Sequence, residues 1–419
     1  MAARDLPQTL TGMRDAFGSD ADRAAALVHR FSEHAGRAGF GLIVTPLLES
    51  LEVFSRVGEG TDVVTKEMYV FTDRDGSEVA LRPETTAQVA RAFLQHHPIP
   101  PWKVWYHSAH FRHEKPQKGR LRQHHQVGAE VIGPVDADVD VEVVVLLWDF
   151  LSDIGLRQLR LEVNSIGDAA TRTAYAQLLT GFLTDRAGDL DPVDAAKIAT
   201  HPLRVLDSKS ARTIAALDGH PRLSELLTGD ATAHFERVRQ GLDAAGVPYV
   251  VNERLVRGLD YYTHTVFEVV STAIDASQST IGAGGRYDGL VEAMGGTLAA
   301  GFGFGSGVER VLLACDAEGV FDVESAPVQY FVVGFGGDGT DVRDLVLELR
   351  RAGISADRAY DHKSPKAQMK AADRSEAPWA LLLGDDERAA GTVTLRDLRG
   401  DRPQRSIARA HLAQELRKP

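Results

Sequence analysis

The chain has 419 residues, 43% of them hydrophobic and 25% charged, which is the composition of a globular protein with two or three domains and excludes collagen-like, coiled-coil and disordered chains. Its net charge of −12 speaks against a uniformly basic surface for nucleic acid, although residues 327–419 carry 16 Lys and Arg against 14 Asp and Glu, so basic patches can exist locally. The single cysteine, Cys315, excludes an internal disulfide and a thiolate zinc site.

Targeting signals are not evident. The N-terminal stretch has charges but no continuous apolar run, and no segment is apolar over the length that a bilayer requires. A chain with one cysteine also suits a reducing compartment. We therefore expect a cytoplasmic protein that has neither a signal peptide nor a membrane contact.

Helical and extended segments follow one another over the first third of the chain. Residues 20–38 have apolar positions at helical spacing and end before Gly39. The extended residues 40–48 contain Pro46, which restricts them to an edge strand or an irregular strand. Residues 101–133 contain two strand-like runs around the basic stretch KPQKGRLR, a pattern that predicts an antiparallel hairpin with a long loop.

Further along, the pattern predicts a buried helix over residues 139–154 and then a small helical insertion over about 171–229, where short Ala- and Leu-rich segments are broken by Gly and Pro. Strand signals resume at 247–255 and 263–271, and a Gly-rich strand leads into a helix over 297–315. Beyond a plausible linker, strands and helices alternate to the end of the chain, which predicts a compact α/β domain.

The hairpin carries the most informative polar residues. Side chains two apart on a strand share a face, so Arg112 and Glu114 are expected to point together on the first strand. Gln126, Gly128 and Glu130 share a face of the second strand, where the glycine leaves room for a ligand. These faces either meet in one cleft or belong to a solvated hairpin with surface ion pairs. The loop adds four cations suited to phosphate, Lys115, Lys118, Arg120 and Arg122.

The Gly-rich run has a functional and a structural interpretation. It passes through Gly301, Gly303 and Gly305 into Ser306-Gly-Val-Glu309, which has the spacing of a capping box. Arg310 then lies in the first turn of a helix whose N-terminus a nucleotide could approach closely. The structural alternative is a Gly-rich turn with a surface arginine.

Two other segments are ambiguous when taken alone. Residues 257–262, Arg-Gly-Leu-Asp-Tyr-Tyr, place an arginine near two aromatic rings that could equally belong to the core. Residues 81–86, Leu-Arg-Pro-Glu-Thr-Thr, could be no more than a helix N-terminus with capping residues.

Together these segments resemble the histidyl-tRNA synthetases, in order and over almost the whole chain. The bacterial family's motifs LRPEGTA, FRxERPQxGRxRxFHQ, RGLDYYxxTVFE and GGRYDGL stand here as LRPETTA (81–87), FRHEKPQKGRLRQHHQ (111–126), RGLDYYTHTVFE (257–268) and GGRYDGL (284–290), and the Gly-rich strand ending in Glu-Arg stands at 301–310. RGLDYY and GGRYDGL are specific to this family among the class II synthetases.

The resemblance implies a histidine–tRNA ligase. Such an enzyme activates L-histidine with ATP to histidyl-adenylate and transfers the histidyl group to the 3′ end of tRNA(His), releasing AMP and diphosphate. Magnesium accompanies ATP, and neither a prosthetic group nor a protein-held metal is expected.

The resemblance also implies the architecture. We expect an α+β catalytic domain over 1–325, with a mixed, largely antiparallel sheet, flanking helices and the helical insertion. An α/β anticodon-binding domain over 327–419 follows. Class II enzymes further imply a homodimer, with the segment around Pro46 at the interface.

The family's histidine pocket can be carried over residue by residue. Glu84, with Thr85 and Thr86, matches the segment that holds the α-amino group, and a carboxylate suits an ammonium. Gln126 and Glu130 match pocket residues near the carboxylate and the imidazole. Tyr261 and Tyr262 match the residues that form the wall of the family's histidine pocket.

The ATP site matches a second set of residues. Arg112 matches the arginine that bridges the amino-acid carboxylate and the α-phosphate, and Arg257 matches the catalytic arginine on the α-phosphate, where related synthetases use a metal. Arg310 matches the arginine on the far phosphates. The remaining matches are Glu114, Arg120 and His124 for ATP and, in the loop, Lys118 and Arg122 for the tRNA acceptor end.

The sequence departs from the family pattern at three of these positions. Thr85 replaces a glycine, Lys115 replaces an arginine, and His124 replaces the phenylalanine expected to stack on adenine. An imidazole can still stack, so adenine binding at His124 remains an expectation.

Two other functions compete with this interpretation. Gly334-Phe-Gly336-Gly-Asp-Gly339 follows a strand-like run, and Asp357 lies near the place of a ribose-binding acid, so motif matching alone would predict a dinucleotide site. A 93-residue tail lacks a second nucleotide-binding half, which argues against a dehydrogenase. The second competitor is a synthetase-like paralogue with a regulatory role, but such paralogues typically lack the anticodon domain and RGLDYY.

Overall fold

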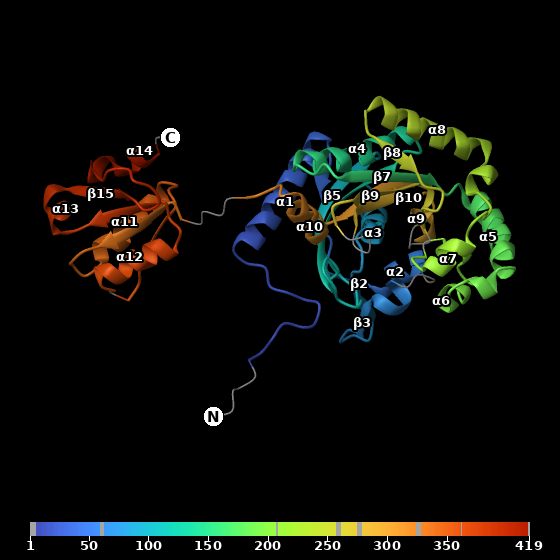
Figure 1. Cartoon of the computed structure of the whole chain (residues 1–419), viewed down its shortest axis with the longest axis horizontal. Coiled ribbons are helices and arrows are strands. Elements are labelled where there is room, and N and C mark those ends of the chain that lie inside the picture. Colours follow the sequence, from blue (N-terminus) through green and yellow to red (C-terminus); the bar gives the residue numbers. More distant parts are fainter. Residues whose placement is uncertain are drawn as a thin grey trace. The chain divides into compact units, whose positions relative to one another are not determined.

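The computed structural model describes residues 6–58, 63–206, 208–256, 261–274, 279–323, 328–361 and 363–417. The chain divides into two compact units, Met1–Val323 and Glu324–Pro419. Figure 1 labels the helices and strands of each unit. Among the described helices, none is both long enough and apolar enough to cross a membrane.

The N-terminal unit is built on an eight-stranded sheet with the order β1-β5-β6-β11-β10-β9-β7-β8. Among the described strands, β1 pairs with β5 and β7 with β8 in parallel, and the other neighbours are antiparallel. The predicted mixed, largely antiparallel sheet is therefore confirmed. In sheet order the strands are Gly41–Leu42, Trp102–Phe111, Gln123–Gly133, Ala300–Gly307, Thr280–Arg286, Thr263–Ser271, Leu159–Ser165 and Tyr249–Val251.

Helices cover one face of this sheet. They are α1 (Ser19–Arg37), α4 (Ala137–Asp153), α8 (Gly229–Ala244) and α10 (Val308–Glu318), so the helices predicted over 20–38 and 139–154 are confirmed. Their apolar sides form one core with alternate residues of the strands, such as Val127, Ala129 and Val131 of β6. The intervening residues of β6 face the opposite side, where the polar residues gather.

On that opposite side lie α2 (Leu51–Gly58), α3 (Thr86–His96) and α9 (Leu290–Ala293). A three-stranded sheet, β2-β4-β3, is formed by Leu48–Ser50, Glu78–Leu81 and Tyr69–Thr72, and the π-helical turn Val63–Glu67 precedes β3. Pro46 stands between β1, at the edge of the large sheet, and β2 in the small one. The predicted edge or irregular position of this proline is correct, because the chain changes sheets there.

The hairpin forms as predicted, but its first strand is shorter than the sequence pattern suggested. Strand β5 ends at Phe111, so Arg112 and Glu114 lie in the loop. The Arg112 N–H still donates across the hairpin to the Arg122 carbonyl at 2.9 Å, but the His113 N–H donates to the Glu67 carbonyl at 2.7 Å, outside the hairpin.

Between β7 and β8 the chain is largely helical, and its apolar residues, such as Tyr175, Leu179 and Leu217, form a cluster with Val266 of β9. Its elements before α8 are α5 (Ala169–Thr184), η2 (Ala187–Asp189), α6 (Pro192–Ala195), η3 (Pro202–Val205), α7 (Ala211–Ala216) and η4 (Leu223–Leu226). Asp168 begins α5 by accepting a hydrogen bond from the Thr171 N–H at 2.7 Å, a regular N-cap.

The C-terminal unit is the predicted α/β domain. Its five-stranded sheet has the order β13-β12-β14-β15-β16, with parallel pairing around β12 and antiparallel pairing beyond β14. The strands in that order are Ala356–Arg358, Tyr330–Gly334, Trp379–Leu383, Thr392–Asp397 and Arg405–Ala408. The helical elements are α11 (Thr340–Arg351), α12 (Pro365–Arg374), α13 (Asp385–Ala390), η6 (Arg409–His411) and α14 (Leu412–Leu416).

Candidate active site

A cavity of about 400 Å³ opens on the face of the large sheet that the α1, α4, α8 and α10 helices leave uncovered. Side chains from β5, β6, β9, β10, the hairpin loop and the starts of α3 and α10 line it. The structure thus brings together residues that are more than 200 positions apart in the chain. Eleven predicted site residues line the cavity: Glu84, Thr85, Thr86, Arg112, Glu114, Arg120, His124, Gln126, Tyr261, Tyr262 and Arg310.

One end of the cavity is formed by the start of α3. The buried Glu84 accepts a hydrogen bond from the Ala87 N–H at 3.0 Å through Oε1, so this carboxylate caps the helix instead of a threonine hydroxyl. Its other oxygen, Oε2, is buried without a hydrogen-bond partner among the described residues. Burial raises the pKa of Glu84, while the helix N–H groups and Arg112 oppose that shift. An unsatisfied carboxylate oxygen of this kind suits a cationic ligand.

Glu130 lies behind the cavity wall. It is fully buried, and its Oε1 accepts from the Thr86 hydroxyl at 2.6 Å while its Oε2 accepts from the Tyr287 hydroxyl at 2.7 Å. Burial raises its pKa to about 8, although both hydrogen bonds favour the ionised form. At neutral pH this shift favours the protonated form of the Glu130 carboxyl.

Alternate glycines of β11 make room for the polar side chains of the neighbouring strands. A Cβ atom at Gly301 would lie 2.0 Å from the Tyr287 ring, one at Gly303 would lie 1.6 Å from Oε2 of Glu130, and one at Gly305 would lie 2.6 Å from Oε1 of Gln126. At Gly301 and Gly303 protein side chains therefore fill the space, whereas Gly305, beside Gln126, and Gly307 line the cavity as the Gly-rich run before α10 predicts. The prediction for Gly128 is wrong, because the Tyr106 ring occupies the room expected for a ligand.

Cations gather at the other end of the cavity. Arg310, in the first turn of α10, donates to the carbonyls of Gly119 and Thr280 at 2.9 and 3.1 Å. Burial lowers the pKa of this arginine below its ordinary value, and the nearby Arg120 and Arg112 lower it further. Arginines that repel one another across a cavity favour a polyanionic ligand.

Two of these arginines have protein partners that hold them in place. Arg112 donates through Nε to the Pro83 carbonyl at 3.0 Å, which ties the hairpin loop to the segment before Glu84. Arg120 pairs with Glu114. Arg112 and Glu114 do share the cavity as predicted, but through the path of the loop and not through alternation along a strand.

His124 lines the cavity beside Arg112 and Arg310. Burial, followed by Arg112, lowers its pKa to about 3, so its imidazole is neutral at physiological pH. Its ring meets that of His110 edge to face, with centroids 5.6 Å apart. A neutral ring in this position can still offer an aromatic face to a planar ligand.

The predicted capping box at α10 does not form. Ser306 is still part of β11, and its hydroxyl donates to the Ile281 carbonyl at 2.8 Å. Glu309 instead accepts from His125, at 3.0 Å from the backbone N–H and at 2.9 Å from Nδ1. The strand continues to Gly307, which leaves no side chain at the N-cap position to bond the helix.

Among the described residues, three predicted ones do not line the cavity, Glu130, Arg122 and Lys118. Glu130 stands behind Thr86, and Arg122 donates to the Glu114 carbonyl at 3.1 Å from within the loop. Lys118 is exposed on the loop. Arg257 falls outside the described residues, as do the three residues that follow it.

Other lining residues were not predicted. They include Tyr106, Lys209, Glu268, Thr280 and Glu309. Tyr106 could have been found from the hairpin register, because it lies directly opposite Gly128. Lys209 comes from the helical segment between β7 and β8, and no local pattern marks it.

The chain matches known families over both units. Residues 12–311 match the family model described as Histidyl-tRNA synthetase, and residues 329–419 match that described as Anticodon binding domain. The chain is 47% identical to the histidine–tRNA ligase of Rubrobacter xylanophilus, over 88% of this chain and 87% of that protein. It is 43% identical to the histidine–tRNA ligase of Parasynechococcus marenigrum, over 97% of each.

Solved structures show the same likeness. The apo S. aureus histidyl-tRNA synthetase is similar with a TM-score of 0.82 at 30% identity, over 99% of this chain and 100% of that one. A Bacillus halodurans protein described as an ATP phosphoribosyltransferase regulatory subunit/histidyl-tRNA synthetase has a TM-score of 0.65 at 19% identity, over 90% of this chain and 98% of that one, which is a likeness of fold alone.

Gly303→Ala tests the packing of β11 against β6. The new methyl group would overlap the Glu130 carboxyl, so we expect a loss of stability of about 1–3 kcal/mol or more, measured by urea denaturation. Gly181→Ala is the control, because its Cβ meets nothing within 4 Å in the interior of α5 and should stabilise the helix by up to about 1 kcal/mol. Equal stability of the two variants would contradict the proposed packing constraint.

Glu130→Gln tests the protonation of the buried carboxyl. Between about pH 4.5, its ordinary pKa, and pH 8, the folded protein holds one proton more than the unfolded chain, so this stabilising contribution is complete at low pH and is lost as pH rises. The difference in unfolding free energy between pH 5 and pH 8.5 should be smaller in the variant than in the parent, by an amount on the order of a few kcal/mol. An unchanged pH dependence would show that Glu130 is ionised throughout.

Proposed function

This chain belongs to the histidyl-tRNA synthetase family and is a histidine–tRNA ligase, and we propose that the cavity between β6, β11 and the start of α3 is its active site. The enzyme joins histidine to tRNA with ATP, by way of histidyl-adenylate, and releases AMP and diphosphate. The observation that supports this location is the opposition of a buried, unsatisfied oxygen of Glu84 at one end to Arg112, Arg120 and Arg310 at the other. An amino acid with a cationic amino group and a polyphosphate fit such a cavity in one orientation.

The carboxylate end would bind histidine. Glu84 Oε2 supplies the acceptor that an α-ammonium group needs, with Thr85 and Thr86 beside it. Gln126 would bind the carboxylate. Glu130 would accept the imidazole N–H at the second acceptor position of one of its oxygens, since each oxygen already has one donor. The rings of Tyr261 and Tyr262, whose centroids are 4.8 Å apart, would form the wall of the histidine pocket.

The cationic end would bind ATP. Arg112 would bridge the histidine carboxylate and the α-phosphate, and Arg310 and Arg120 would hold the far phosphates, with Glu114 fixing Arg120 by its ion pair. His124 would lie on the adenine ring as a neutral imidazole. Arg257, which matches the family's catalytic arginine, would be the second ligand of the α-phosphate.

The mechanism follows from these positions. The histidine carboxylate attacks the α-phosphorus in line, diphosphate leaves, and the protein contributes orientation and positive charge on the phosphoryl oxygens. Guanidinium groups that burial already fixes, such as Arg310, need little reorganisation as this charge develops. A site that hydrogen-bonds an imidazole rejects analogues that lack it, so no editing domain is needed.

Magnesium would arrive with ATP. Glu114, Glu268 and Glu309 line the cavity, and carboxylate oxygens are the donors that Mg²⁺ prefers. Glu114 and Glu309 are already engaged by Arg120 and His125, so these residues suit an ion held mainly by the phosphates. When bound, the ion would neutralise the diphosphate end of ATP.

The alternative of a regulatory paralogue is not favoured. The chain matches the anticodon-binding domain over 329–419, and the R. xylanophilus and P. marenigrum relatives named histidine–tRNA ligase cover most or nearly all of its length. A dinucleotide site in the tail is also disfavoured, because Asp357, the candidate ribose ligand, pairs with Arg350 at 3.0 Å.

The C-terminal unit would contribute the contact with the anticodon. A cavity of about 580 Å³ lies between the first residues of α11 and α12, lined by Arg343, Arg358, Lys363 and Tyr360 among others. Cations beside an aromatic ring suit the phosphates and splayed bases of a single-stranded loop. In the hairpin loop, Lys118 and Arg122 would contact the acceptor end.

The enzyme would act as a cytoplasmic homodimer. Leu42, Val44, Leu47, Val70 and Phe71 are exposed apolar residues around Pro46 and the small sheet. Exposed apolar side chains that gather in one region mark an interaction surface, and a second copy of the chain is the partner that the family resemblance implies.

Amino-acid-dependent exchange between ATP and pyrophosphate tests the function. Exchange should appear with histidine and stay near background with the other nineteen amino acids, because a site that hydrogen-bonds an imidazole rejects side chains that lack it. Exchange with another amino acid but not with histidine would overturn the specificity.

The double variant Arg343→Gln, Lys363→Gln tests the anticodon contact. It should raise the KM for tRNA at least fivefold and leave histidine-dependent exchange unchanged, because the lost cations lie in the C-terminal cavity. Lys366→Gln, Lys370→Gln removes the same charge from α12 outside that cavity and serves as the control. If both double variants change tRNA charging equally, the cavity is not the RNA site.

A further inference from the structure

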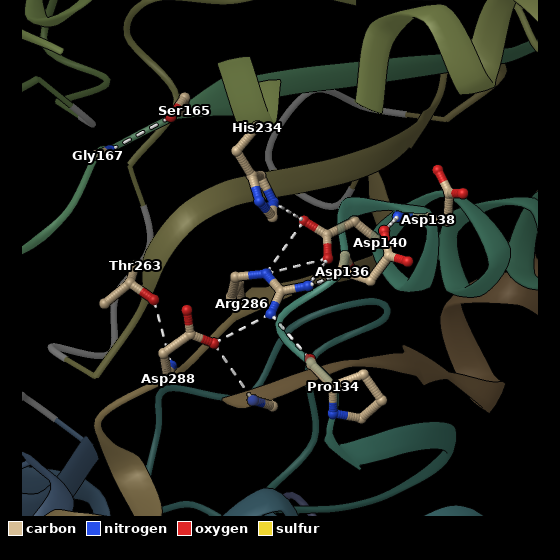
Figure 2. Close-up of polar contacts among 11 residues, drawn as sticks. Pro134, Asp136, Asp138, Asp140, Ser165, Gly167, His234, Thr263, Arg286 and Asp288 are labelled. Atoms are coloured by element: carbon tan, nitrogen blue, oxygen red, sulfur yellow. Dashed lines mark hydrogen bonds and ion pairs between the residues drawn. The ribbon is translucent and has the colours of Figure 1, made fainter. Parts of the chain in front are cut away.

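A fully buried arginine, Arg286, stands at the end of β10, next to the amino-acid end of the cavity but not on its wall. Its Nε and Nη2 donate to the Asp140 carboxylate, Nη2 also donates to the Asp136 carbonyl at 3.0 Å, and Nη1 donates to the Pro134 carbonyl at 3.4 Å and to Asp288 at 3.1 Å. All five N–H groups of the guanidinium therefore have acceptors, as Figure 2 shows.

The two carboxylates extend this network into other elements. Asp140, fully buried on α4, also accepts from Nε2 of His234 on α8 at 2.9 Å. Asp288 accepts from the Gly301 N–H at the start of β11 at 3.3 Å, and its own N–H donates to the Thr263 hydroxyl at the start of β9 at 3.2 Å. The guanidinium thus joins the end of β10 to two helices and two further strands.

A gain in stability does not by itself explain why the Arg286–Asp140 ion pair is buried. The desolvation of two buried charges offsets most of their attraction, so a buried ion pair contributes little net stability, although removal of one partner is costly. What a fully satisfied guanidinium does provide is a fixed geometry for the segments that it joins. The residue whose position is set most directly is Tyr287, because both of its chain neighbours belong to the network.

Tyr287 leads from the network to the cavity. Its ring fills the space left by Gly301, and its hydroxyl donates to Oε2 of Glu130 at 2.7 Å. Glu130 accepts in turn from Thr86, which lines the cavity. A small displacement of Tyr287 would leave this carboxyl free to rotate, while the ATP end of the cavity would keep its contacts.

We propose that the Arg286–Asp140 ion pair is a positioning device for amino-acid recognition, which holds Tyr287 and through it the Glu130 carboxyl at the histidine end of the cavity. This role rests on the proposed location of the active site and goes beyond it, because neither Arg286 nor Asp140 touches the cavity. The device acts on the affinity for the amino acid and not on that for ATP.

A double-mutant cycle in the full-length enzyme tests the proposal. Asp140→Asn and Tyr287→Phe should each raise the KM for histidine at least tenfold in pyrophosphate exchange and change the KM for ATP less than twofold. If the ion pair acts through the tyrosine hydroxyl, the double variant should be no worse than Tyr287→Phe alone. Asp138→Asn is the matched control on α4, because Asp138 pairs at 2.8 Å with the exposed Arg237, and both KM values should stay within twofold.

Three results would overturn the proposal. They are an unchanged KM for histidine in Tyr287→Phe, additive effects in the double variant, and a loss of activity in Asp140→Asn that raises both KM values alike. Should Asp140→Asn fail to fold, Arg286→Lys takes its place in the cycle, and failure of both to fold would show a purely structural role. Absence of histidine-dependent exchange in the parent enzyme would instead overturn the proposed function.

Discussion

The site depends on the close approach of side chains to the backbone of β11. At Gly301, Gly303 and Gly305 a hydrogen atom stands where any other residue would place a Cβ, and the side chains of Tyr287, Glu130 and Gln126 occupy that space. A strand with larger residues there would push these polar groups out of the sheet face. Three glycines weaken the strand, because glycine has a low strand propensity. In return, the polar side chains of the neighbouring strands pack directly against the β11 backbone, which only glycine allows.

Charge separation within one cavity follows from this packing. Glu84 and Glu130 lie at the end formed by α3 and β6, and Arg112, Arg120 and Arg310 come from the hairpin loop and α10, where Glu114 and Glu309 balance part of their charge. Burial acts on both ends, because it raises the pKa of Glu84 and Glu130 and lowers that of Arg310. The Glu84 oxygen without a hydrogen-bond partner at one end and the mutually repelling arginines at the other suit an enzyme that must bring an ammonium and a triphosphate together.

Two predictions from sequence show how the structure changes the partners of correctly chosen residues, one of them confirmed by another route and one of them wrong. Arg112 and Glu114 do meet in the cavity, but they lie in a loop that departs from the strand after Phe111. Glu309 has the spacing of a capping box, yet its carboxylate serves His125 on the neighbouring strand. Local sequence patterns identify which residues can form an interaction. The partner of each residue depends on which element lies next to it in the folded chain.

The sequence by itself determined the family, the order of strands and helices, the α/β character of the tail and eleven of the residues that line the cavity, because periodicity and ordered motifs are local properties of the chain. Only the tertiary structure decided that Glu130 lies behind Thr86, that Tyr106 fills the space at Gly128, and that Arg286 is satisfied by Asp140 across 146 positions. Such pairings depend on strand register and on the packing of helices over the sheet. Neither is encoded within a single segment, so contacts between distant segments follow only once the whole core has formed.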